Sequence, residues 1–236
     1  MSTENNGDQG NPELKAGPEI TDTGRLEAFS DGVYAIAGTL LVLDLRVPDE
    51  QTIAMSGGLL PALGKMWPNY LAYLISFTFI LIMWSNHHHI FVLIRHANRQ
   101  LLLINGLLLL FTTVLPFPTS LLSRFIGTDA AGVAVFIYSA NFLLIAVCYN
   151  LLWRYAAYWG NLLDPRFDRQ YADAVTRMYN VGLVAYGACV VLAIVPSIGA
   201  ALSLGLSVGL ALFFTLTPSR TFRKAARTTR SASMLE

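Results

Sequence analysis

Long apolar segments that could each cross a lipid bilayer restrict the fold of this chain more than any other feature of its sequence. An α-helix rises about 1.5 Å per residue, so about 20 consecutive apolar residues span the hydrocarbon core of a membrane. Charged residues, proline or glycine bound six such segments. The segments are residues 25–46, 67–94, 98–123, 130–158, 175–195 and 198–216. We therefore predict an all-α, polytopic membrane protein with six transmembrane helices.

The composition agrees with this class. Hydrophobic residues make up 54% of the 236 residues and charged residues only 13%, whereas soluble domains contain roughly one quarter charged residues. The net charge of +1 provides no extended basic surface, so we expect no binding to nucleic acid. Both cysteines, Cys148 and Cys189, lie within apolar segments, where a reduced, buried thiol is more typical than a disulfide or a metal site.

Lysine and arginine residues are concentrated in alternate links between the segments, which indicates the orientation in the membrane. Such links are retained on the cytoplasmic side. The basic links contain Arg95, Arg99, Arg154, Arg166, Arg169 and Arg177, and the C-terminal segment contains Arg220, Arg223, Lys224, Arg227 and Arg230. We therefore expect both termini to lie in the cytoplasm and the protein to reside in the cell membrane.

The two ends of the chain differ in composition from the apolar part between them. Residues 1–24 are polar and rich in glycine and asparagine, which predicts a disordered cytoplasmic tail. Residues 25–216 form the predicted transmembrane domain, and residues 217–236 form a basic cytoplasmic tail. The first apolar segment is too long for the core of a secretory signal, so we expect it to be retained as a span.

Prolines predict two local features of the bundle. Pro116 and Pro118 lie near the end of the third span, where lost backbone hydrogen bonds should kink or break the helix. Pro196, Ser197 and Gly199 separate the last two spans and predict a tight turn. The last two spans should therefore form an antiparallel hairpin.

An ionisable residue, Asp31, lies about two turns into the first span, in the sequence Phe29-Ser30-Asp31-Gly32. Ionisable groups within a membrane are costly, so each is a candidate functional residue. Two interpretations are open at this point. Asp31 is either a buried carboxylate that neighbouring helices hold by hydrogen bonds, or a group that contacts an ion directly.

Helical geometry separates Asp31 from an apolar stripe on the same span. Successive residues turn by about 100°, which places Leu40, Leu43, Gly32 and Phe29 within about 40° of Ile36, and Thr39 within about 60°. Ser30 and Asp31 fall more than about 100° away from Ile36. Asp31 and Ile36 are therefore predicted to face different surroundings.

Polar residues in the second span include Trp84 and three consecutive histidines, residues 87–89. Consecutive helical residues point about 100° apart, so three such histidines cannot easily bind one metal ion, and we expect no metal site. Trp84 and His88 share a helix face at a spacing of four, and together they could hydrogen-bond Ser30 and Asp31 of the first span. Further asparagines within the spans, such as Asn105, are typical of hydrogen bonds between helices.

The first span resembles the signature of the transmembrane protein 175 family. The resemblance rests on Arg25, on Phe29-Ser30-Asp31-Gly32 and on the apolar sequence that follows, with support from Trp84, His88 and Pro116-Phe117-Pro118. The chain is similar to the prokaryotic, single-repeat members, relatives of the animal lysosomal potassium channel. One departure is Gly38, where relatives often have a bulkier apolar residue.

This resemblance implies a potassium-permeable channel, a homotetramer in the lipid bilayer in which four copies of the first helix surround a central pore. It implies a hydrophobic constriction formed by Ile36, Leu40 and Leu43, with Thr39 adding a hydroxyl layer. The signature residues are expected to pack and hydrogen-bond within the subunit and to support the pore helix. These residues are Arg25, Phe29, Ser30, Asp31, Trp84, His88 and Asn105. Potassium is the permeant ion, no cofactor is expected, and the protein is not expected to be an enzyme.

Two other function classes remain as alternatives. A secondary or proton-coupled transporter would use Asp31 and His88 as a titrating pair. A metal or haem enzyme within the membrane would rest on the histidines alone. The sequence contains no Gly-Tyr-Gly filter, no phosphate loop and no zinc-protease motif, which disfavours a filter-type channel or an ATP-driven pump.

Overall fold

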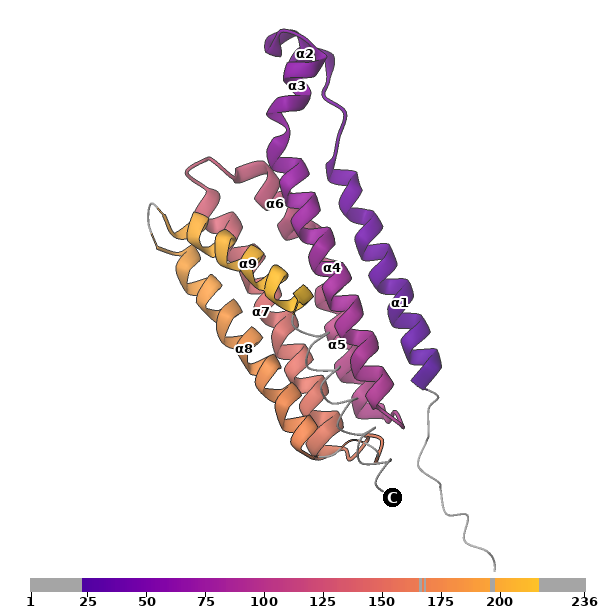
Figure 1. Cartoon of the computed structure of the whole chain (residues 1–236). Helices are drawn as coiled ribbons and strands as arrows, with labels where there is room; N and C mark the ends of the chain where they lie inside the picture. The colour runs from indigo at the N-terminus through magenta and orange to yellow at the C-terminus, as the bar shows by residue number, and fades with distance from the viewer. Residues whose placement is uncertain (1–22, 166, 168, 196–197, 217–236) are drawn as a thin grey trace, which may run out of the picture.

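The computed structural model describes residues 23–165, 167, 169–195 and 198–216, and these residues form a helical bundle (Figure 1). The long helices are α1 (Thr23–Leu40), α4 (Trp67–Leu93), α5 (Arg99–Val114), α7 (Ala131–Arg154), α8 (Arg169–Ala193) and α9 (Gly199–Leu216). Shorter elements are η1 (Leu41–Asp44), α2 (Glu50–Ser56), α3 (Leu59–Lys65), α6 (Pro116–Phe125) and η2 (Tyr155–Trp159). The predicted tails lie outside the described residues, except that Thr23 and Gly24 already belong to α1.

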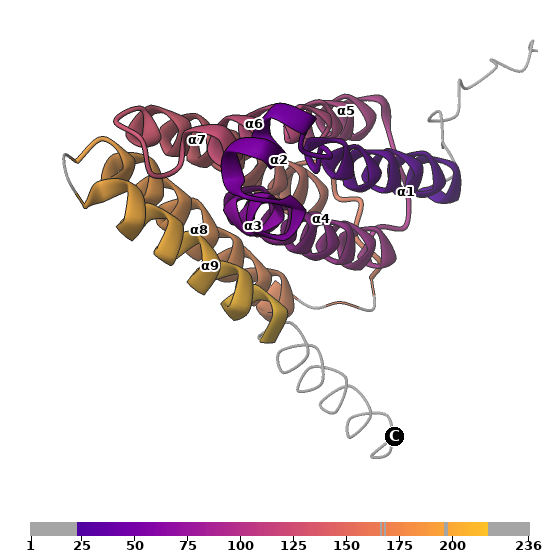
Figure 2. The ribbon, with the colours of Figure 1, turned by 90° about the horizontal axis from the view of Figure 1, so that it is seen from above.

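Helix α1 lies at one edge of the bundle, beside α4 and α5 (Figures 1 and 2). Helix α7 occupies the interior, where it packs against α5, α6, α8 and α9. Its sequence explains this position, because apolar residues surround it on nearly all sides and many of them are buried, including Tyr138, Phe142 and Trp153. Helix α1 has only one buried side, and its opposite side is exposed in the part of the chain that the structure describes.

The predicted break in the third span is confirmed. Helix α5 ends at Val114 and α6 begins at Pro116, with Leu115 between them. A proline at the first position of a helix lacks only an N–H that has no intrahelical partner there, so Pro116 begins a new helix more readily than it continues the old one. At the other end, the side chain of Asn98 accepts a hydrogen bond of 3.0 Å from the backbone N–H of Leu101 and caps α5.

The link between α1 and α4 contains two short helices that the sequence analysis did not predict, α2 and α3. They project beyond the end of the bundle (Figure 1). Asp49 caps α2 by accepting the N–H of Thr52 at 2.7 Å, and the hydrogen bonds from Thr52 lower the pKa of this carboxyl. Gly57 ends α2 with a φ of 79°, a left-handed conformation that suits glycine.

Helices α8 and α9 lie side by side as the predicted antiparallel hairpin (Figures 1 and 2). Gly199 makes the close approach possible, since a Cβ at this position would lie 2.1 Å from the carbonyl oxygen of Leu192. Pro196 and Ser197 of the predicted turn lie outside the described residues. Helix α8 begins at Arg169, six residues before the predicted start at Val175, because its first turns are polar and escape a search for apolar residues.

Within residues 23–216, apart from the few that the structure does not describe, five helical segments are long and apolar enough to cross a membrane. They are Thr23–Asp44, Trp67–Leu93, Arg99–Phe125, Ala131–Trp159 and Arg169–Ala193. They match the first five predicted spans. The sixth predicted span coincides with α9, in which a shorter apolar stretch, Gly199–Leu210, is recognised among the described residues.

The link between α4 and α5 is tied to the link between α7 and α8. Ile94 and Leu163 form an isolated antiparallel β-bridge. The backbone N–H of Arg95 donates to the carbonyl of Leu162 at 2.9 Å, and the N–H of Asp164 donates to the carbonyl of Leu93 at 3.0 Å. This bridge joins the ends of four helices on the side of the bundle where α1 begins (Figure 1).

Candidate functional site on helix α1

The outward face of α1 consists of Phe29, Gly32, Ile36, Thr39, Leu40 and Leu43. All six residues are exposed in the single chain. The exposed fraction reaches 58% for Ile36 and 68% for Leu43, although both side chains are large and apolar. Residues on the other side of the helix, such as Ser30, Tyr34 and Leu41, are buried. A continuous apolar stripe of this size on one helix is typical of a surface that another molecule covers.

The outward face continues into η1, which changes its geometry. The chain tightens from α-helix to 3-10 helix at Leu41–Asp44, so that residues three apart are eclipsed. Leu43 therefore lies directly in line with Leu40, about 60° from the position that a regular α-helix would give it. The two leucines form a single column on the exposed side, and Val42 points away from it.

Thr39 lies between Ile36 and Leu40 on the same face. Its hydroxyl donates a hydrogen bond of 2.9 Å to the carbonyl oxygen of Ile36, one turn earlier. A hydroxyl that donates to its own helix still offers oxygen lone pairs outward. Thr39 is thus the one polar acceptor among the outward-face side chains.

Behind the outward face, a buried hydrogen-bond chain connects α1 with α4 and α5. His87 donates from Nε2 to Oδ1 of Asn105 at 2.8 Å, and Nδ2 of Asn105 donates to the hydroxyl of Ser30 at 2.9 Å. The Ser30 hydroxyl in turn donates to the carbonyl of Leu26 at 2.8 Å. The donor assignments follow because the asparagine amide faces serine and its oxygen faces the imidazole. His87, Asn105 and Ser30 are all fully buried.

Two further contacts join the first helix to α4 nearer the surface. The indole N–H of Trp84 donates to Oδ1 of Asp31 at 2.9 Å, and Nδ1 of His88 lies 2.5 Å from Oε1 of Glu27. The expectation that Trp84 and His88 share Ser30 and Asp31 is therefore correct only for Trp84 and Asp31. Ser30 is bound by Asn105 instead, and the partner of His88 is Glu27.

Arg25 and Phe29 do not follow the expectation of packing within the subunit. Both side chains are exposed, and Phe29 is 65% exposed. Phe29 belongs to the same helix face as Ile36, so it turns away from α4 and α5 when Ser30 turns toward them. The network within the subunit thus consists of Ser30, Asp31 and Glu27 from α1 and their partners on α4 and α5.

Tyr34 fixes the middle of α1 to the interior of the bundle. Its hydroxyl lies 2.8 Å from the hydroxyl of Tyr149 on α7, and Tyr149 donates to the carbonyl of Met83 on α4 at 2.5 Å. Tyr34 is 2% exposed and packs edge-on against His87. Together with the Ser30 chain, this contact sets the rotation of α1 and hence the direction of its outward face.

The three histidines of α4 point in different directions. His87 contacts Asn105, His88 contacts Glu27, and Nδ1 of His89 lies 2.6 Å from the carbonyl of Ser85. Among the described residues, no three His, Cys, Asp or Glu side chains gather in a way that could hold a metal ion.

Comparison with known proteins identifies the family. The family model described as endosomal/lysosomal potassium channel TMEM175 matches residues 25–116. A potassium channel of Chamaesiphon minutus is 44% identical over 84% of this chain and 96% of that protein. The chain belongs to the TMEM175 family. It also resembles the crystal structure of a lysosomal potassium-selective channel TMEM175 homolog from that organism, with a TM-score of 0.75 and 42% identity over 84% of this chain and 97% of that one.

Animal members of the TMEM175 family match only part of this chain. The endosomal/lysosomal proton channel TMEM175 of Gallus gallus is 46% identical over 106 residues, which are 43% of this chain and 21% of that protein. The matched family is one of ion channels, and the chain is accordingly not an enzyme. The region matched by the TMEM175 model contains the outward face of α1. It also contains the residues of α4 and α5 that hydrogen-bond to the inward side of α1.

Glu27, Tyr34 and His87 also belong to this site, but sequence reasoning did not select them. A signal for Glu27 existed, because it precedes Asp31 by four residues and so shares its helix face. His87 had a weaker signal, since one of three consecutive histidines must face the bundle. Tyr34 had no signal in the sequence, because the sequence alone does not distinguish a buried tyrosine from one at the membrane interface.

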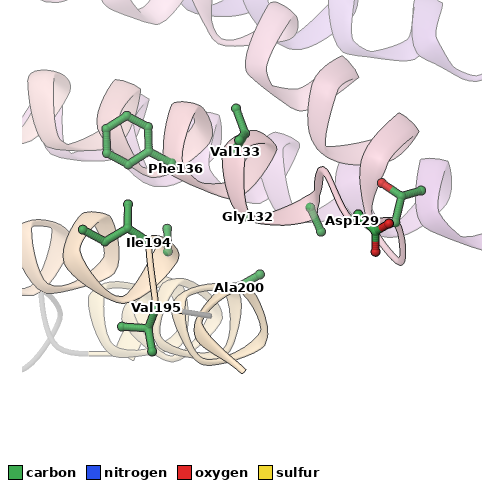
Figure 3. Close-up of a pocket in the computed structure, with 10 residues that line it drawn as sticks. Asp129, Gly132, Val133, Phe136, Ile194, Val195 and Ala200 are labelled. Carbon is green, nitrogen blue, oxygen red and sulfur yellow. The ribbon is translucent and has the colours of Figure 1, made fainter. Parts of the chain in front are cut away.

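An open crevice of about 630 Å³ lies elsewhere, between the start of α7 and the junction of α8 and α9. Figure 3 shows Val133 and Phe136 on α7 opposite Ile194 and Val195, with Asp129 at the margin. Its lining is mainly apolar and its one carboxylate is exposed. This crevice therefore offers no arrangement of groups for ion passage.

Proposed function

We propose that this protein is a potassium-permeable cation channel that conducts passively through a pore lined by α1. Membership of the TMEM175 family supports the proposal, as do the names of its relatives as potassium channels. The observation that carries it is the outward face of α1, an apolar stripe that no described residue of the single chain covers. An apolar constriction hinders hydrated ions by dewetting, so modest helix movements can gate it.

The proposed assembly is a homotetramer. Each chain supplies one α1, and a single helix encloses a pore only when symmetry repeats it around an axis. In this assembly Ile36, Leu40 and Leu43 form the constriction and Thr39 adds a layer of hydroxyl oxygens. Phe29 and Gly32 continue the same surface toward the start of the helix.

The proposed role of the hydrogen-bond network is to hold α1 at the correct rotation. Ser30, Asp31, Trp84, His88 and Asn105 act within the subunit, and Glu27 and His87 complete their contacts. Because Asp31 lies behind the outward face, its substitution should reduce assembly more than it changes ion preference.

We further propose six spans with α9 as the sixth, both termini in the cytoplasm, location in the cell membrane, and conduction without a cofactor. Residues 25–216 are the proposed channel domain.

Reconstitution of the purified protein into planar bilayers with asymmetric potassium and sodium tests the function. Unitary current steps that reverse toward the potassium equilibrium potential are expected. A flux that saturates without unitary steps would refute the channel. A proton gradient in a separate arm tests proton permeation, in view of the animal relatives that are named proton channels.

The variant Ile36→Asn tests the constriction. A polar side chain should wet the pore and raise the unitary conductance severalfold. The matched control is Ile194→Asn, because Ile194, which directly follows the end of α8, is similarly exposed, 66% against 58%, but lies far from α1 in the chain. An unchanged conductance in Ile36→Asn would exclude this residue as the narrowest point.

The second candidate is a transporter in which Asp31 and His88 gain and lose protons as a pair. The contacts disfavour it, because Asp31 receives the N–H of Trp84 and His88 contacts Glu27. Under this alternative, His88→Gln should abolish coupled flux. Under the channel proposal, unitary currents persist in His88→Gln.

A further inference from the structure

A second cavity of about 630 Å³ opens between the α4–α5 link and the α7–α8 link, and no residue of α1 lines it. Arg95 and His96 line it from the first link, and Asn161 lines it from the second. Tyr158 of η2 and Arg169 of α8 complete its polar wall. The cavity thus brings together two arginines and a histidine from two separate parts of the chain, the α4–α5 link and the start of α8.

The walls of this cavity are held in place by the backbone. The bridge between Ile94 and Leu163 fixes the two links to each other, and Arg95 itself donates its N–H to Leu162. Asn161 has a φ of 48°, a left-handed conformation that turns the second link toward the first. Tyr158 is also fixed, since its hydroxyl donates to Asp173 at 2.7 Å and lies 2.9 Å from the hydroxyl of Thr176.

The charge of the cavity lining favours an anion. Within the part of the chain that the structure describes, neither Arg95 nor Arg169 forms an ion pair. The guanidinium of Arg169 lies 6.0 Å from the ring centre of Tyr158, which leaves its N–H groups available. Arg169 and Ala172 of the first turn of α8 both line the cavity, and the start of this helix adds partial positive charge. Asp164 is the only carboxylate among the described lining residues.

Size and position narrow the class of anion. A cavity of about 630 Å³ is far larger than an inorganic ion and lies within the range of small-molecule sites, roughly 300–1,000 Å³. It lies at the helix ends that the arginine distribution predicts to be cytoplasmic. Basic pockets between helices on that side of a membrane are suited to the phosphate of a lipid headgroup.

We propose that this cavity, defined by Arg95, His96, Asn161 and Arg169, binds a phosphate group carried by a molecule of headgroup size. The two guanidinium groups bind the phosphate oxygens, and Asn161 and Tyr158 line the space for the remainder of the ligand. Both a phospholipid and a soluble phosphate ester present this chemistry. The site is independent of the proposed channel function, and its test requires no ion flux.

The experiment measures ligand binding to the purified protein by native mass spectrometry, with thermal stabilisation as a second readout. Three probes share the phosphate: dioctanoyl phosphatidic acid, glycerol 3-phosphate and inorganic phosphate. Binding of phosphatidic acid alone identifies a lipid site, whereas binding of glycerol 3-phosphate with similar affinity identifies a soluble ligand. Failure of all three probes to bind overturns the proposal.

The double variant Arg95→Gln with Arg169→Gln should weaken binding at least roughly tenfold, because charge-assisted hydrogen bonds to phosphate are lost. The matched control is Arg99→Gln with Arg177→Gln, which removes the same charge from exposed residues outside the cavity. Equal weakening in both double variants would show a general charge effect and overturn the site. If the first double variant does not fold, Arg95→Lys and Arg169→Lys keep the charge but lose the bidentate geometry, and each should still weaken binding.

Discussion

The indole nitrogen of Trp84 lies 2.9 Å from Oδ1 of Asp31, so a carboxylate in the first span is bound by a neighbouring helix of the same chain. Replacing Trp84 by Phe removes the N–H and leaves that oxygen without this donor. We expect the free energy of unfolding to fall by about 1–2 kcal/mol, measured by thermal unfolding in detergent. Trp67→Phe is the control, because Trp67 is 56% exposed at the start of α4, and it should shift stability by less than about 0.5 kcal/mol. Equal effects of the two variants would count against the hydrogen bond.

Ser30 and Asn105 should be energetically coupled. Ser30→Ala leaves the amide of Asn105 without its acceptor in a fully buried position, which should cost about 1–3 kcal/mol. In a double-mutant cycle with Asn105→Ala, the coupling energy should exceed about 0.5 kcal/mol. A control cycle of Ser30 with Ser139, which is bonded to Ser203 on α9, should be additive. Additivity in the first cycle as well would show that the contact contributes nothing.

Gly38 sets the separation of α1 from α4. A Cβ at this position would lie 3.4 Å from the ring of Phe77 and 3.8 Å from Ile80, so alanine fits and leucine does not. We expect Gly38→Ala to stabilise the helix by up to about 1 kcal/mol and Gly38→Leu to destabilise the protein. Gly106→Leu is the control, since no described atom beyond its own chain neighbours and helix backbone lies within 4 Å of its added Cβ. Thermal unfolding distinguishes these outcomes, and a tolerated Gly38→Leu would show that α1 is free to move outward.

The alignment of Leu43 with Leu40 depends on the 3-10 geometry of η1, and substitutions test whether this geometry is present in the proposed pore. Leu43→Ala should raise the unitary conductance, because it removes bulk in line with Leu40. Val42→Ala should leave the conductance unchanged, although Val42 is 47% exposed, because η1 turns it about 120° away from the column. Recordings in planar bilayers measure the unitary conductance of the two variants. A larger effect of Val42 would indicate that the segment is α-helical in the conducting state.

The spans and the outward face of α1 could be predicted from sequence because both depend on quantities that do not vary between proteins. The thickness of the bilayer sets the length of an apolar helix, and the rotation per residue sets which side chains share a face. Ile36, Thr39 and Leu40 were placed together on this basis, and all three are exposed on one side. Pro116 was equally informative, because a missing N–H acts locally.

The partners of the polar residues could not be predicted in the same way. Whether His88 contacts Asp31 or Glu27 depends on how far α4 is shifted along α1, and no local pattern encodes that offset. The 3-10 turn at Leu41–Asp44 and the helices α2 and α3 also escaped prediction. Their sequences are compatible with other conformations, and their geometry depends on the packing around them.

The antiparallel bridge between Ile94 and Leu163 makes the ends of α4, α5, α7 and α8 a stationary frame. Helix α1 begins outside this frame and meets it only through side chains. Any motion of α1 would therefore resemble a lever that pivots between Ser30 and Tyr34, where side chains of α4, α5 and α7 hold it. The largest displacement would fall at its far end, where η1 gives way to chain without regular secondary structure at residues 45–49.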